Sequence, residues 1–347
     1  MQLRTRGTTI TGMSREDARK TAGLDWKVIP RPILVEGTTR NVKAEGYKAL
    51  MRSDIRDGDP QPLAIASDKY EVFQNEAILD MMFDAAEAAG VDLERAGSYD
   101  GGRAIWAVTG TSSKAKAEVS VGDTISLKLR MTSGHGPGKA FNVQSIVERL
   151  VCSNGATATG VSEKISISHR RKLTSRDLDY IKGLFQSAVE GFGDFIWKAK
   201  DLRNAATTTG LNRLIVAELL GQDILDEAIK ATVPEMWRRL KTDRGQLLRD
   251  AADHIQRNHI NIRWQEGTST RHRNLIDEVV NETERFQVGR ELAGNSLWNT
   301  YNGITHHFNH RNGRTEDTGL ESAFNGTGAK IMNRAFDLVY EVAQANK

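Results

Sequence analysis

The sequence predicts an α+β protein, in which an N-terminal domain with an antiparallel β-meander and helices packs on an all-α C-terminal domain. Two changes of hydrophobic period support this fold class. From Asp92 to Ser168 apolar and polar residues alternate with a period of two, as in strands with one buried face. After His169 apolar residues recur at helical spacing. No low-complexity linker separates the parts, so we expect domains over 1–170 and 171–347 that pack together.

The segment before the meander mixes strand and helix. Ser14 begins a short helix, because its hydroxyl can cap the first turn. A longer helix is predicted over 75–90, where apolar residues recur every three or four positions and Gly90 ends the pattern. Extended segments are expected at 26–30, 32–37, 47–54 and 62–73. Pro30 and Pro32 are expected to break the chain between the first two.

The meander itself consists of extended segments joined by turns that contain glycine. These segments are expected at 101–112, 116–121, 123–134 and 139–152. Within 123–134 the alternation places Leu127 and Leu129 on one face, and Lys128 and Arg130 on the other.

The C-terminal half reads as helices throughout. The first, which begins at Ser175, carries a stripe of apolar residues on one side. The predicted helical segments are 175–205, 211–221, 234–256, 271–286, 291–310 and 329–345.

Composition excludes several classes of protein. The 347 residues carry one cysteine, so neither a disulfide framework nor a cysteine-based zinc site is expected. No apolar run is long enough to span a membrane, and the N-terminus lacks the apolar stretch of a signal peptide. We therefore expect a cytoplasmic protein with no membrane partner. A net charge of +3 permits a nucleic-acid partner without requiring one.

The segment from Gly134 to Ala140 resembles a phosphate-binding loop at first sight. Only three residues separate Gly134 from Gly138, and alanine follows Lys139 where a Walker A motif has serine or threonine. The segment also joins two strands, whereas a phosphate-binding loop leads into a helix. Two interpretations remain: a glycine-rich hairpin connection, or a basic loop in which Lys139 and His135 contact a phosphodiester backbone.

Two further groups of residues could carry chemistry. Cys152 ends an apolar strand with no base or cation beside it in sequence, which favours buried packing over a nucleophile. His306, His307 and His310 have the spacing of a metal site, but the glutamate of an HExxH motif is missing. A helix end that faces solvent or a partner is the favoured interpretation. No catalytic set, metal site or cofactor is therefore predicted.

The placement of charge is more informative. The sequence between Arg103 and Arg149 contains seven cationic and three anionic side chains. A second basic cluster follows at the expected domain junction. A basic sheet face beside a basic junction is typical of a groove that follows a nucleic-acid backbone, although a solvated sheet face has the same pattern. The predicted DNA-contacting residues are Arg103, Lys128, Arg130, His135, Lys139, Arg149, Arg170, Arg171 and Lys172.

The order of short motifs along the chain resembles one known family. The motifs are GLDWKV, LMRSD, DKYEVFQNEAILD, GSYDGGRAIWAV, VGDTISLKLRMTSGHGPGKA, RLVCSNG and NSLWNTYNGITHHFNHRNGRT. Together they resemble the phage- and plasmid-associated family called domain of unknown function 932, over the region from Leu24 to Ala335. The resemblance implies a mobile-element origin in a bacterial host. By analogy of fold it also suggests a relation to phage single-strand annealing proteins, which form rings or filaments.

These observations predict a non-catalytic phage protein that binds single-stranded DNA by its backbone and anneals complementary strands during recombination. A homo-oligomer, ring or filament, is the expected assembly. Two alternatives stay open. One is a metal-dependent nuclease that uses the three histidines, and the other is a protein that binds a host defence factor.

Overall fold

The computed structural model describes residues 7–54, 62–111, 115–137, 139–149, 164–168, 173–240, 243–260, 269–285, 293–310 and 327–345. The strands are β1 (Thr8–Thr9), β2 (Val28–Val35), β3 (Val42–Arg52), β4 (Ala64–Ser67), β5 (Leu93–Tyr99), β6 (Ala104–Thr109), β7 (Lys116–Ser120), β8 (Asp123–Gly134), β9 (Ala140–Arg149) and β10 (Lys164–Ser168). The helices are α1 (Arg15–Thr21), α2 (Asn75–Ala88), α3 (Ser175–Asn204), α4 (Thr209–Leu220), α5 (Gln222–Thr232), α6 (Pro234–Leu240), α7 (Arg244–Arg257), α8 (Thr270–Arg285), α10 (Leu297–His310) and α12 (Thr327–Gln344).

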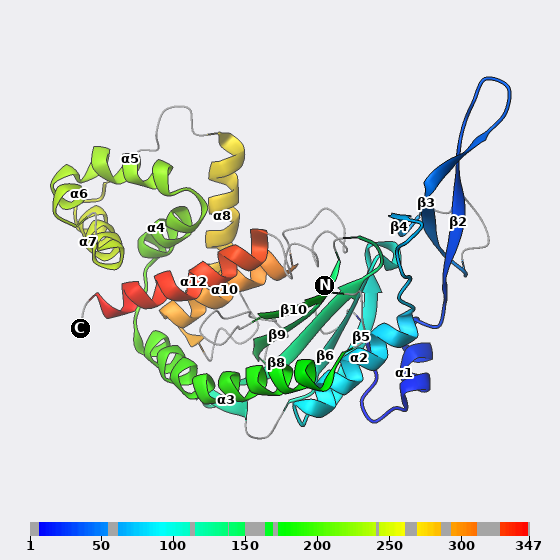
Figure 1. The fold of residues 1–347 in the computed structure, drawn as a ribbon. Helices are drawn as coiled ribbons and strands as arrows, with labels where there is room; N and C mark the ends of the chain where they lie inside the picture. Colours follow the sequence, from blue (N-terminus) through cyan, green and yellow to red (C-terminus); the bar gives the residue numbers. More distant parts are fainter. Residues whose placement is uncertain are drawn as a thin grey trace.

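A large antiparallel sheet occupies the centre of the molecule (Figure 1). Its strand order is β1-β5-β6-β8-β9-β10, and β7 pairs with the first residues of β8, Asp123 to Ser126. All pairings in this sheet are antiparallel, so the predicted antiparallel sheet is confirmed, but β6 pairs with β8 and not with β7, the strand that follows it along the chain.

A second, smaller sheet consists of β2, β3 and β4. The prediction that Pro30 and Pro32 separate two extended segments is wrong, because β2 continues through both prolines as one strand, with a shift of register between Pro32 and Leu34. β2 is an edge strand that pairs with β3 alone, and the two prolines are spaced by two residues. Both missing N–H groups can therefore face the open edge, where no partner strand needs them.

Helices α2 and α3 cover the apolar face of the large sheet (Figure 1). Side chains such as Ile105, Leu127 and Val143 point to this face and are fully buried. Helix α3 begins with a capping box in which Thr174 and Asp177 bond each other's backbone N–H groups. The same helix then continues into the C-terminal half, where α10 and α12 pack on it.

The C-terminal half is helical, as predicted, with differences at helix ends. The expected helix over 234–256 is two helices, α6 and α7, and the helix expected from 291 begins at Leu297. Helix α10 packs between α8, α12 and α3. A Cβ atom at Gly303 would lie 2.4 Å from the Cα of Thr283, so the close approach of α8 and α10 requires glycine at this position.

One hydrophobic core continues from the sheet into the helices, with buried members from Ile10 to Ala343. The predicted boundary at residue 170 lies outside the described residues, and the division into two domains stays a prediction. Among the described helices none is long and apolar enough to cross a membrane.

Candidate nucleic-acid interface

The face of the large sheet opposite α2 and α3 carries most of its polar side chains. The strand register places Arg95 of β5, Lys128 and Arg130 of β8, and Gln144 and Glu148 of β9 on this face. This confirms the expected sharing of a face by Lys128 and Arg130. The centre of this face is not solvated, however, because Lys128 is 1% exposed and Glu148 2% exposed.

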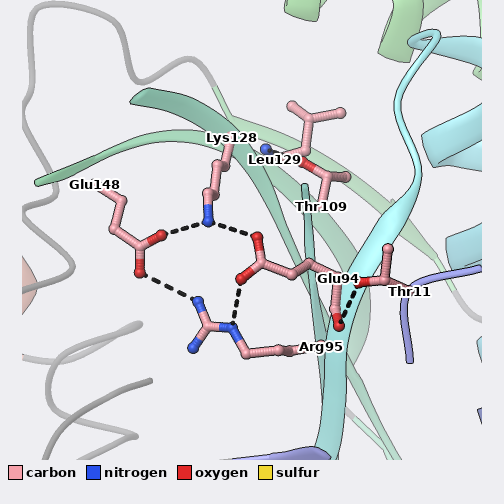
Figure 2. Close-up of polar contacts among 7 residues, drawn as sticks. All are labelled: Thr11, Glu94, Arg95, Thr109, Lys128, Leu129 and Glu148. Atoms are coloured by element: carbon pink, nitrogen blue, oxygen red, sulfur yellow. Dashed lines mark hydrogen bonds and ion pairs between the residues drawn. The ribbon is translucent and has the colours of Figure 1, made fainter. Parts of the chain in front are cut away.

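Three of these side chains, Arg95, Lys128 and Glu148, form a closed ring of ion pairs with Glu94 (Figure 2). Lys128 Nζ lies 2.7 Å from Glu94 Oε2 and 2.5 Å from Glu148 Oε2. Arg95 completes the ring, with Nε 3.2 Å from Glu94 Oε1 and Nη2 3.1 Å from Glu148 Oε1. Each carboxylate therefore bridges both cations, and the ring has no net charge. Burial without such pairing would cost several kcal/mol for each ion.

The expectation that Lys128 and Arg130 lie on a solvent-facing surface is therefore wrong. Lys128 is enclosed by its two carboxylate partners. Arg130 is 5% exposed, and its Nη2 donates to Gln144 Oε1 at 2.7 Å. Burial lowers the pKa of Arg130 to about 10. Contact between either side chain and a phosphate would require this face to open.

Arg149 lies on the other face of the sheet and is also buried. Its register partner in β8 is Ile125, so it points towards the apolar side. Its Nε and Nη2 atoms donate to Asp123 Oδ1 and Oδ2 at 2.5 and 2.7 Å. Trp298 Nε1 of α10 donates to the same carboxylate at 2.9 Å. The expected surface position of Arg149 is wrong, since this cation and Asp123 connect the sheet to the helical half.

The loop from Gly134 to Lys139 is a connection between β8 and β9, and its histidine is buried. His135 Nε2 lies 2.8 Å from Asn75 Oδ1. The Asn75 Nδ2 group donates to the carbonyl oxygens of Leu24 and Trp26 at 3.1 and 3.0 Å, so Oδ1 is the acceptor and His135 Nε2 carries the proton. The imidazole also meets the Trp26 ring edge to face, with centroids 5.5 Å apart. The surface role expected for His135 is wrong in this geometry.

Glycines let this loop approach its neighbours closely. Gly136 has φ +113°, and a Cβ atom there would lie 2.4 Å from the Cβ of Ala64 in the small sheet. A Cβ atom on Gly134 would lie 2.6 Å from the carbonyl oxygen of Arg103 and 3.3 Å from Cγ of Lys139. Arg103 and Lys139, two of the predicted cations, therefore flank the same glycine at one end of the large sheet.

Unlike the cations on the strands, these two reach the surface. The side chain of Arg103 is 41% exposed, donates to the Pro62 carbonyl oxygen and lies 3.5 Å from Asp100 Oδ1. Lys139 is exposed. Arg52, at the end of β3, donates from Nη1 to the carbonyl oxygen of Gly101, two residues before Arg103. We call Arg52, Arg103 and Lys139 the basic sheet end.

Of the three residues of the basic sheet end, Arg52 is the least available for contact with a phosphate. Its Nε and Nη2 atoms form a bidentate pair with Asp54 at 3.0 and 2.7 Å. Its guanidinium also stacks 4.5 Å from the ring centroid of Trp26. The charges of Arg103 and Lys139 are therefore more available to a phosphate than that of Arg52.

The predicted basic junction of Arg170, Arg171 and Lys172 lies outside the described residues, as does Cys152. The strand before the junction is described, and its last residue, Ser168, pairs with Ala140. Strand β10 thus ends beside Lys139, at the basic sheet end.

The three histidines of α10 do not form a metal site among the described side chains. His306 Nδ1 lies 2.9 Å from Glu282 Oε2 of α8. His307 is buried, with its ring against Phe308. The side chain of His310 lies outside the described set. Within the described residues no group of three or more histidine, cysteine or acidic side chains is arranged to hold a metal ion.

Sequence reasoning missed the partners that neutralise the predicted cations. Glu94, Arg95 and Asn75 lie more than thirty residues from Lys128 or His135. The only local signal was the alternation in β9, which puts Glu148 on the same face as Lys128. Arg52 was missed because it lies in the small sheet, outside the segment of charge excess.

Comparison with known proteins gives one family. The family model described as "Domain of unknown function (DUF932)" matches residues 62–326, which is most of the chain. No curated protein and no solved structure gave a significant match.

Proposed function

This chain belongs to the DUF932 family, and we propose that it binds the sugar-phosphate backbone of single-stranded DNA at the basic sheet end and promotes annealing of complementary strands. The observation that carries the proposal is that the backbone carbonyl of Arg103 and the side-chain stem of Lys139 both lie next to Gly134. The last residue of β10, Ser168, pairs with Ala140 beside Lys139. The sequence continues from β10 directly into Arg170, Arg171 and Lys172.

Backbone contact suits the chemistry of this surface better than reading of bases. Arginine and lysine neutralise phosphates without regard to sequence, and such contacts supply most of non-specific affinity. Trp26, which contacts Arg52 of the basic sheet end, is buried under Arg52 and His135. A strand held by its phosphates keeps its bases free to pair, which is the requirement for annealing.

The assembly in the proposal is a homo-oligomer, a ring or a filament, that acts in recombination of a phage or other mobile element inside a bacterial cell. A long single strand would then cross many copies of the basic sheet end. Because each copy offers few phosphate contacts, tight binding would come from their number.

Fluorescence anisotropy with a labelled single-stranded oligonucleotide, at several salt concentrations and beside the matching duplex, tests the binding. For single strands log K falls with log salt by about 0.7 for each neutralised phosphate. The double variant Arg103→Ala/Lys139→Ala should weaken binding and reduce the slope by about 1.4 per bound subunit. A triple variant of Arg170, Arg171 and Lys172 to alanine tests the junction in the same assay.

The matched control is Lys230→Ala, an exposed cation on α5 at the far side of the molecule (Figure 1). It should leave affinity and slope unchanged. Annealing is followed with two complementary strands that carry a fluorescence donor and acceptor. The proposal fails if the wild-type protein binds neither form of DNA at low salt, or if both basic variants bind and anneal as the wild type does.

A further inference from the structure

Strands β2 and β3 of the small sheet form a ribbon that extends beyond β4 and away from the rest of the molecule (Figure 1). Its distal part, where Leu34 pairs with Lys43 and Val35 with Val42, exposes three large apolar side chains. Leu34 is 59% exposed, Val35 56% and Val42 54%. Tyr47 and Ile65 add exposed apolar surface nearer the base. Apolar side chains gathered on a protrusion are typical of a protein–protein contact.

The charge of this ribbon indicates the kind of surface that it fits. Between Val28 and Arg52 it carries five cations and two anions. The cations are Arg31, Arg40, Lys43, Lys48 and Arg52, and the anions are Glu36 and Glu45. Its partner should therefore combine an apolar hollow with acidic side chains.

The chain itself offers such a surface beside α1 and α2. A hollow of about 500 Å³ is lined by apolar side chains that include Met13, Phe83 and Val91, with Glu87 and Asp92 at its side. Over its whole length α2 carries four carboxylates and no cation. Arg15 of α1 also lines the hollow and pairs with Asp84 at 2.7 Å and with Glu87 at 3.7 Å. Glu87 is 82% exposed, so the carboxylates at the hollow still outnumber this one cation.

We propose that the distal ribbon of one copy seats in the α1–α2 hollow of a second copy. The ribbon points away from its own α1 and α2 (Figure 1), so the contact joins two chains. The two surfaces are different, so the contact is heterologous and each chain keeps one free ribbon and one free hollow. Repetition then gives a ring or an open filament. This inference stands apart from DNA binding, because the distal ribbon and the hollow include neither Arg103 nor Lys139, and Arg52 lies at the opposite end of β3 from the distal ribbon.

Two variants test the contact, and each reverses the charge on one of the two surfaces. The ribbon variant is Arg40→Glu/Lys43→Glu, and the hollow variant is Glu87→Lys/Asp92→Lys. All four positions are exposed, so the fold should tolerate both changes. Mass photometry and analytical ultracentrifugation should show that the wild type forms oligomers and that each variant alone is monomeric. The control Lys182→Glu, an exposed position on α3, should behave as the wild type.

Mixing the variants separates this geometry from any symmetric dimer. In an equimolar mixture the intact ribbon of the hollow variant meets the intact hollow of the ribbon variant, and the two reversed surfaces also match each other in charge. The mixture should therefore give oligomers larger than dimers in which the two variants alternate, which a two-fold symmetric dimer cannot form. A chain that carries all four reversals has complementary charges again and should regain oligomers.

Three results would overturn the inference: a wild type that is monomeric at every accessible concentration, a ribbon variant whose mass equals that of the wild type, or a mixture that stays monomeric. If the ribbon variant keeps its mass and loses DNA affinity instead, the ribbon binds nucleic acid rather than a second copy.

Discussion

Replacement of Lys128 by methionine should destabilise the protein strongly, because it removes one cation from a buried neutral ring. Lys128 touches both Glu94 and Glu148 and is 1% exposed. After Lys128→Met, Arg95 alone would face two carboxylates, and the ring would carry one uncompensated negative charge. Loss of one partner from a buried ion pair costs about 3–5 kcal/mol.

The lower end of this range is expected here. Arg95 still bonds both carboxylates, and the side chain of Glu94 is 28% exposed, so water can screen part of the charge. Methionine has nearly the volume of the lysine stem and adds little cavity cost. A loss of about 3 kcal/mol, with an unfolding entropy near 2.1 cal/mol/K per residue, lowers Tm by roughly 4 °C.

Urea denaturation followed by far-UV circular dichroism measures the change, with Lys182→Met as the exposed control. The double variant Lys128→Met/Glu148→Gln restores charge balance, so it should recover at least half of the lost free energy of unfolding. Two outcomes would refute the reasoning. One is a loss below about 1 kcal/mol for Lys128→Met, which is the range of surface pairs. The other is a double variant whose cost equals the sum of the single ones.

Two further predictions concern other parts of the fold. Gly136→Ala should cost about 1–3 kcal/mol, because φ is +113° and the new Cβ would meet that of Ala64; a thermal melt unchanged within error would contradict this. Asp337→Asn should raise Tm at pH 7, because burial raises the pKa of Asp337. The folded state then holds a proton that the unfolded chain has lost, so stability falls as pH rises through the window between the ordinary pKa and the raised one. Below that window, near pH 3, the gain over the parent should vanish, and an equal gain at both pH values would show that charge is not the cause.

Local periodicity was sufficient to predict strands before residue 170 and helices after it, but it missed helix α5 and did not separate α6 from α7. A period of two between residues 92 and 168 depends only on neighbouring side chains, and the structure has strands there. The same alternation put Lys128 and Arg130 on one face correctly. The alternation could not show whether that face is covered, because burial of the face depends on contacts between residues that are far apart in the sequence. Glu94, which pairs with Lys128, comes from a strand 34 residues earlier.

The loop before β9 is a second case in which local sequence could not reveal contacts between residues far apart in the chain. Its spacing excluded a Walker A motif, and the structure has a strand connection there. The position of His135 depends on Asn75, sixty residues earlier in the chain, so no local pattern could reveal that the ring is buried. Proline gave a wrong break in β2, because its effect depends on whether the strand lies at a sheet edge.

The buried ring also changes how the DNA-binding hypothesis must be tested. A cation that already bonds internal carboxylates adds little to the field at the surface, so Lys128 should not contribute to phosphate affinity. Alanine at Lys128 would nevertheless reduce binding if it unfolds the protein, and affinity alone would mislead. The double variant Lys128→Met/Glu148→Gln avoids this, because the remaining ring is neutral. It should bind single-stranded DNA as the wild type does, whereas Arg103→Ala/Lys139→Ala should bind weakly although fully folded. The reverse pattern would mean that the polar sheet face opens to admit the strand, and that DNA contacts this face instead of the basic sheet end.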